Sequence, residues 1–235
     1  MIVDTMSMEE VGKAVIKAAI ASRMKIFGLV KRKENKYRKV ILKGGEKYYD
    51  FKPIPMVTDG ITFYVCPHTK GKRDYKKYGI LYAVFAHFFY KGTNWYALLL
   101  QNYERVAIYQ HHFFERYIER HLMNNSEVTL ETVMQYFKET DYHSQSKTFE
   151  NSLHNNCIYG ATNIGVCCGY HCGISILIWL TYIDKETLTK GAKKEHFDKY
   201  KDDEPIGFDA SGHRIYKSDL LNLYVRFHNN INYYG

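Results

Sequence analysis

Ionisable side chains are concentrated in the segment HHFFERYIERH, residues 111–121, which sets histidines, arginines and glutamates side by side. At 3.6 residues per turn, His112, Arg116 and Arg120 follow one another along one face of a helix. The apolar residues of this stretch fall on another face, and these are Phe113, Phe114, Tyr117, Ile118 and Leu122. The spacing predicts a short amphipathic helix over residues 112–122 that packs on a sheet and presents a row of polar groups.

The row contains the residue types that metal-free RNA cleavage requires. The helix dipole favours the neutral imidazole at His112, and a neutral imidazole can act as a general base. Forked arginine donors suit a phosphate. After the base removes a ribose 2′-hydroxyl proton, the leaving oxygen needs a second proton carrier, and His87 and His111 are the nearest candidates in the sequence. The predicted catalytic residues, with no cofactor and no metal, are His112, Arg116, Arg120 and His87.

The same residues also fit a solvated helix face without a catalytic role. Glu115 and Glu119 alternate with Arg116 and Arg120, at spacings that allow them to pair with one another. Such exposed pairs contribute only about 0.2–0.5 kcal/mol each. Both interpretations of the helix remain open at the level of sequence.

The string HFFERYIER resembles the H-x-x-x-R-x-x-x-R helix of toxin-like domains with the barnase–EndoU–colicin–RelE (BECR) ribonuclease fold. In those domains a second helix and an antiparallel sheet follow. Here TLETVMQYF, CIYGATNIGVC and SILIWLTYI follow in that order, so the resemblance covers residues 108–184.

This resemblance implies a base at His112, phosphate binding by Arg116 and Arg120, and Thr181 or Tyr182 facing them from the last strand. Two features depart from the family pattern. A long meander of strands precedes the motif, and a long polar loop follows the second helix.

The N-terminal region has the pattern of one long helix. Ser7 and Glu10 form a capping-box signature, and apolar residues then recur at helical spacing with lysines between them. We expect a helix over residues 8–30 with a basic exposed side. Residues 1–34 are predicted to be a helical arm that docks or self-associates, and residues 35–235 to be a single domain.

The middle of the chain has strand patterns separated by turns. The runs, within residues 37–110, are KVILK, KYYDFKPI, ITFYVC, GILYAVFAHFFY, WYALLLQ and RVAIYQ. Short connections favour antiparallel neighbours, and PHTKGKRDYKK is expected to be a basic loop. The predicted fold class is α+β, an antiparallel β-sheet meander with helices packed on one face and an N-terminal amphipathic helix.

Beyond the charged helix, Thr129 introduces a helix over residues 130–138, and residues 139–156 are expected to form a loop. CIYGATNIGVCCGYHC and GISILIWLTYI are predicted to be two buried strands. Further helices are expected over residues 184–200 and 218–229. CCGYHC is a set of small residues packed in the sheet, part of a zinc site, or a group of redox-active thiols.

The composition indicates which kinds of binding partner and which cellular compartment to expect. Lys and Arg number 33 against 25 Asp and Glu, a net charge of +8, which favours RNA, another nucleic acid or an acidic protein as partner. No apolar run reaches the length of a membrane span, and the start lacks a secretion-signal pattern. With five cysteines, we expect reduced thiols and a cytoplasmic location.

Two functions from different classes remain. One is a toxin-like, metal-independent ribonuclease that uses the His/Arg helix. The other is a non-enzymatic protein of a bacterial mobile element or phage that binds nucleic acid or a protein. No P-loop, GxGxxG, HExxH or GxSxG motif points to another common chemistry.

Overall fold

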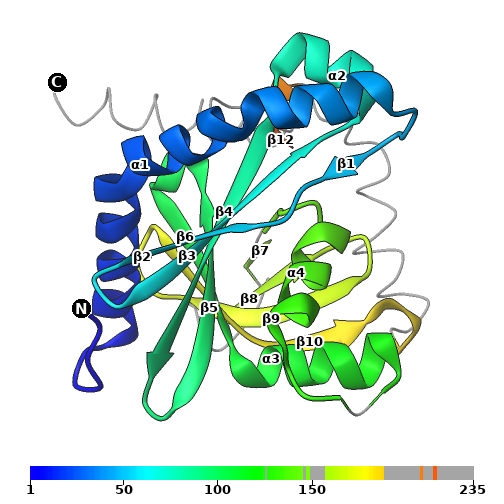
Figure 1. Cartoon of the computed structure of the whole chain (residues 1–235). Helices are drawn as coiled ribbons and strands as arrows, with labels where there is room; N and C mark the ends of the chain where they lie inside the picture. Colours follow the sequence, from blue (N-terminus) through cyan, green and yellow to red (C-terminus); the bar gives the residue numbers. More distant parts are fainter. Residues whose placement is uncertain (125, 145–146, 149–156, 188–206, 209–213, 216–235) are drawn as a thin grey trace, which may run out of the picture.

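The computed structural model describes residues 1–124, 126–144, 147–148, 157–187, 207–208 and 214–215. A mostly antiparallel sheet lies between a long N-terminal helix on one face and two shorter helices on the other (Figure 1). Its strands are β1 (Tyr49–Asp50), β2 (Ile54–Thr58), β3 (Ile61–Thr69), β4 (Leu81–Tyr90), β5 (Thr93–Leu100), β6 (Arg105–Gln110), β7 (Lys147–Thr148), β8 (Cys157–Ala161), β9 (Gly165–His171) and β10 (Ile176–Asp184). A separate pair consists of β11 (Gly207–Phe208) and β12 (Arg214–Ile215).

The helices are α1 (Met8–Lys43), α2 (Gly71–Tyr78), α3 (His111–Tyr117) and α4 (Leu130–Glu139). The strand order is β1-β3-β4-β5-β6-β10-β9-β8-β7, with β2 paired to β3 outside this path. The predicted meander is confirmed for β3 to β6, where each strand is antiparallel to the next. β10 instead joins β6 in parallel, because α3, α4 and three strands form the crossover between them.

α1 is longer than the sequence pattern predicted. The capping box is confirmed: the Glu10 carboxylate accepts from the Ser7 backbone N–H at 2.7 Å, and the Ser7 hydroxyl accepts from the Glu10 N–H at 3.3 Å. The helix continues past the expected end at residue 30, and KVILK forms its last turns rather than a strand. Tyr37 and Ile41 extend the helical spacing and are buried, and this packing selects the helix.

The proposed arm boundary at residue 34 therefore falls inside α1. Val15, Ala19 and Ile26 are fully buried in a core cluster that also contains sheet residues such as Phe63 and Ile108. Figure 1 shows the N-terminal half of α1 along one side of the sheet and its C-terminal half across the top. This apolar face of the helix is covered by the chain's own sheet.

The opposite face of the sheet carries α3 and α4, as the α+β prediction requires. Aromatic side chains fill this second core. The ring centroids of Phe113 and Tyr136, for example, lie 5.1 Å apart in an edge-to-face geometry. Sheet residues Tyr109 and Trp179 belong to the same cluster. Even and odd positions of each strand thus feed two separate cores, which explains the nearly continuous apolar runs in β4 and β5.

Several local predictions were wrong or lie outside the described residues. The basic segment expected to be a loop contains the end of β3 and the helix α2. The stretch expected to be one strand after Cys157 is the hairpin β8–β9, whose turn is fastened by the Thr162 hydroxyl and Gly165. The expected helix over residues 184–200 begins as a 3₁₀ turn, Lys185–Thr187, and continues outside the described residues. The helix expected over residues 218–229 lies outside them entirely, as does most of the loop over residues 139–156.

Candidate functional site

The predicted row of charged residues lies on the outer side of α3. Phe113, Phe114 and Tyr117 are fully buried against the sheet, so the remaining positions of this short helix face outward. α3 follows β6 directly and passes into a π-helical turn, Ile118–Leu122, which ends at Met123 in the left-handed conformation with φ 54°. The predicted amphipathic helix is thus present, with a change of helix type in its second half.

His112 and Arg116 contact carboxylates of their own helix. The His112 Nδ1 lies 2.8 Å from the Glu115 Oε2, and the Arg116 Nε donates to the His112 Nε2 at 3.2 Å. Arg116 also donates to the Glu119 carboxylate at 2.5 Å. Because a guanidinium can only donate, the His112 Nε2 is the acceptor in its contact with Arg116.

Arg120 and His87 point elsewhere. Arg120 donates to the backbone carbonyl of Tyr182 in β10 at 2.5 Å. Residue 120 falls in the π-helical turn, and its guanidinium contacts β10 rather than His112 or Arg116. The His87 Nε2 lies 3.0 Å from the Asn94 Oδ1, and its ring stacks on Tyr96 at 5.1 Å. The four predicted residues therefore do not form one hydrogen-bonded group.

A different histidine sits at the centre of a polar network. The His121 Nδ1 lies 2.8 Å from the Asp184 Oδ1, and its Nε2 lies 3.3 Å from the Glu139 Oε2. The Tyr117 hydroxyl donates to Glu139 at 2.6 Å, and the Tyr182 hydroxyl donates to Asp184 at 3.3 Å. The network joins the π-helical turn, the end of α4 and the end of β10. Nothing in the spacing of these residues along the sequence indicates it.

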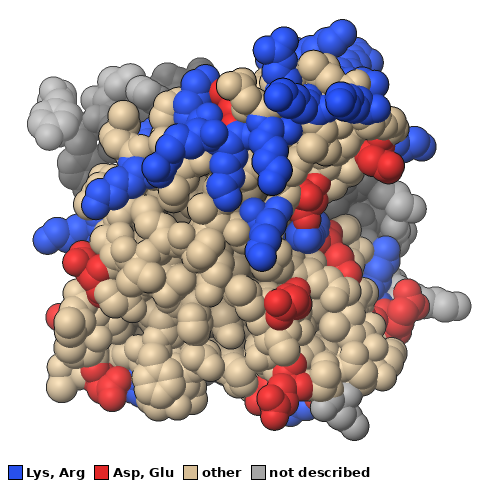
Figure 2. All heavy atoms as spheres, viewed as in Figure 1, with Lys and Arg blue, Asp and Glu red and all other residues tan. Residues whose placement is uncertain are grey.

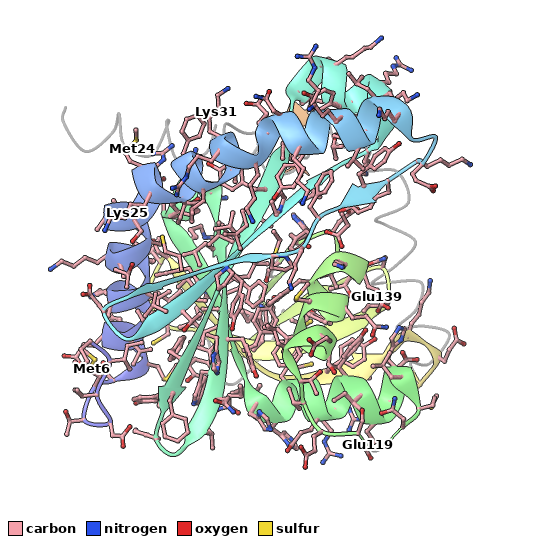
Figure 3. All side chains as sticks on the ribbon, viewed as in Figure 1. Met6, Met24, Lys25, Lys31, Glu119 and Glu139 are labelled. Carbon is pink, nitrogen blue, oxygen red and sulfur yellow. The ribbon has the colours of Figure 1, made fainter. Side chains whose placement is uncertain are left out.

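Burial and hydrogen bonds set the ionisation of this network. Burial works against ionisation of Asp184, but the Glu186 amide and the His121 ring outweigh it and hold the pKa of Asp184 below its usual value. Burial, reinforced by the neighbouring carboxylates, raises the pKa of Tyr117 and of Tyr182. In Figure 3, Glu139 lies at the end of α4, whereas Glu119 lies at the outer edge of the molecule. We interpret the His121 network as a clamp between three elements.

The cysteine cluster packs inside the sheet layer. The Cys167 thiol is buried beside the Tyr136 hydroxyl, with the oxygen 3.1 Å from the sulfur, and burial raises the pKa of Cys167 to about 12. Cys168, the next residue on the strand, is partly exposed. Across the described residues, no group of three or more His, Cys, Asp or Glu side chains is placed to hold a metal ion.

The strongest charge feature is a surface formed by α1 and α2. We define the basic surface as the exposed Lys and Arg side chains of residues 23–43 and of α2, namely Arg23, Lys25, Lys31, Arg32, Lys33, Lys36, Arg38, Lys39, Lys43, Lys72, Arg73, Lys76 and Lys77. Figure 2 shows these charges as an almost unbroken band across the top of the molecule. α1 and α2 contact each other, so the two sets of cations adjoin.

Few carboxylates interrupt the basic surface. Glu34 and Asp74 are the acidic residues of these two segments. Lys31 pairs with Glu34 at 2.6 Å, and within the described residues no other cation of the basic surface has an ion-pair partner. The α3 row differs, because its histidine and arginine each contact a glutamate.

Comparison with protein-family models, with curated proteins and with solved structures finds no match to this chain. The resemblance to BECR ribonucleases therefore stays a prediction. Among the described helices, none combines the length and the apolar character needed to cross a bilayer.

Proposed function

We propose that this protein binds nucleic acid through the basic surface. The observation that carries the proposal is the asymmetry of charge. Residues 23–43 and α2 contain 13 Lys and Arg against 2 Asp and Glu, and the rest of the chain contains 20 against 23. A net charge of +8 is thus produced by one face, and cations without carboxylate partners remain available for phosphates.

The form of the basic surface suits a nucleic-acid backbone. On α1, positively charged side chains recur along one side of the helix at Lys25, Arg32, Lys36, Lys39 and Lys43. From Lys25 to Lys43 the helix rises about 27 Å, long enough to contact several successive phosphates. Contacts of this kind give affinity without reading base sequence.

The test is binding of fluorescently labelled RNA and DNA to the full-length chain, measured by anisotropy at several salt concentrations. Lys39→Glu is expected to weaken binding about tenfold and to reduce the slope of log affinity against log salt by about 1. Lys91→Glu makes the same charge change on the exposed turn between β4 and β5, away from the basic surface, and is expected to leave binding within about twofold. Equal losses in the two variants, or no binding by the wild type, would reject the proposal.

Cleavage of bound RNA at α3 is a second proposal. His112 would act as the general base, and the Glu115 carboxylate lies 2.8 Å from its Nδ1, in the position of an orienting group. Arg116 covers the Nε2, so a substrate phosphate must first draw that guanidinium away. Incubation of labelled RNA with EDTA should then yield fragments from the wild type and none from His112→Ala. Intact RNA in both reactions, or fragments in both, counts against this site.

We also propose a cytoplasmic location for the protein. Cys66, Cys167, Cys168 and Cys172 are free thiols, as expected of a protein in a reducing compartment, and a nucleic-acid partner agrees with that location.

A further inference from the structure

A groove of about 750 Å³ opens on the N-terminal half of α1, apart from the basic surface. Ile16, Ile20 and Ala21 line it from α1. Ile174 lines it from the turn before β10, and Ile176 from the first position of that strand. Its floor depends on a close approach between α1 and β10. A Cβ atom on Gly12 would come within 2.6 Å of the Ile176 Cδ1, so glycine is what allows the helix to lie this near the strand.

An exposed apolar ridge borders the groove. Ile20, Met24 and Phe27 are 51%, 78% and 50% exposed, and their spacing places them along one side of α1. Ile174, in the turn before β10, is 80% exposed. Figure 3 shows Met24 pointing away from the sheet, at the place where α1 changes direction. This half of the helix thus exposes an apolar strip beside its charged side chains. Clustered exposed apolar residues mark an interaction surface.

The charges around the groove indicate the occupant. The rim carries Glu9, Lys13, Lys17 and Glu104, equal numbers of each sign, and Glu9 already pairs with Lys13 at 2.5 Å. A balanced rim gives no attraction to a strongly acidic or strongly basic partner. The rims of two copies can pair with each other. A two-fold axis brings the lysines of each rim opposite a rim that also carries glutamates.

We propose that a second copy of this chain occupies the groove. In the two-fold dimer, the ridge formed by Ile20, Met24 and Phe27 of each copy inserts beside Ile174 of the other copy. A symmetric contact of this kind requires a projection and a recess on the same patch, and this surface has both. Side chains spaced along one helix face also pack into the groove of a crossing helix. The inference does not depend on nucleic-acid binding, because the named contact residues are apolar, although Arg23 and Lys25 of the basic surface flank Met24.

Sedimentation velocity of the full-length chain tests the dimer. Between low micromolar and hundreds of micromolar protein, the mass is expected to rise from 27.7 kDa to twice that value. Met24→Glu and Ile174→Asp are each expected to raise the dimer dissociation constant at least about tenfold, since each places a charge in the apolar contact. Val57→Glu is the matched control, because Val57 is 70% exposed on β2, outside the groove. Circular dichroism and thermal unfolding establish that all three variants remain folded.

A bifunctional maleimide reagent then locates the contact. Met24→Cys is expected to give a covalent dimer in higher yield than the wild type, whose own thiols set the background, and Val57→Cys is expected to match that background. A chain that stays monomeric over the whole concentration range overturns the proposal. In that case the groove is covered by another part of the same chain or by a different partner. A dimer that Met24→Glu and Ile174→Asp leave intact uses a different surface and overturns it equally.

Discussion

Single residues of the His121 network connect parts of the chain that lie far apart in sequence. His121 comes from a π-helical turn, Glu139 from a helix and Asp184 from a strand. The His121 ring contacts both carboxylates, Asp184 at 2.8 Å and Glu139 at 3.3 Å. Asp184 is the most buried of the three, with 5% of its side chain exposed. Loss of one partner leaves buried polar atoms unsatisfied, so we assign the network to stability.

The network predicts a specific acid sensitivity. The pKa of Asp184 is lower in the folded chain than in the unfolded chain, so its carboxylate stabilises the fold above pH about 4 and loses this effect as pH falls through the folded pKa. Asp184→Asn is expected to cost about 1–3 kcal/mol of unfolding free energy at neutral pH, and the difference from the wild type should shrink below pH about 4. Urea unfolding across pH measures this. Asp59→Asn, on an exposed turn, is the control, and a pH-independent difference for Asp184→Asn contradicts the assignment.

At the scale of elements, α1 positions both proposed surfaces. One uninterrupted helix supplies a buried stripe for the sheet, an apolar outer patch in its first half and most of the basic surface in its second half. In its N-terminal half, Gly12 lies close against Ile176 of β10. Its C-terminal half contacts α2, and its residues Tyr37 and Ile41 pack with Tyr49.

Two glycines in α1 provide a matched comparison. Gly12→Ala sets a Cβ atom 2.6 Å from the Ile176 Cδ1 and is expected to lower the unfolding free energy by about 1–3 kcal/mol through overpacking. Gly28→Ala has no atom within 4 Å of the new Cβ, and alanine favours a helix interior, so a gain of about 0.5–1 kcal/mol is expected. Chemical denaturation of both variants measures the two effects. A Gly12→Ala variant as stable as the wild type would show that α1 can shift away from β10.

At the scale of the whole molecule, the two sides of the sheet differ in their surface charges. The face under α3 and α4 holds an aromatic core and the His121 clamp, and its surface charges pair with one another. The face under α1 carries the unpaired cations and the apolar groove on its outer side. Both proposed binding surfaces thus lie on the outer side of a single helix that the rest of the fold holds in place.

Local patterns along the sequence determined the elements that are stabilised by their own residues. Ser7 with Glu10 and Thr129 with Thr132 begin helices through side chains three residues apart, and such caps are legible without a structure. The alternating and apolar runs of β3 to β6, joined by short turns, likewise predicted their antiparallel pairing. The concentration of Lys and Arg near residues 23–43 was visible as well, although its meaning was not.

Tertiary contacts decided the rest. KVILK is compatible with a strand or a helix, and burial of Ile41 beside Tyr37 and Tyr49 made it the end of α1. Arg120 contacts the Tyr182 carbonyl of β10 instead of the other members of the predicted row, and only the fold brings that carbonyl near. The His121 clamp, the groove and the continuity of the basic surface arise from elements that meet only after folding. The spacing of residues in the sequence determines contacts within one helix or hairpin. Contacts between distant segments form only when the helices pack on the two faces of the sheet.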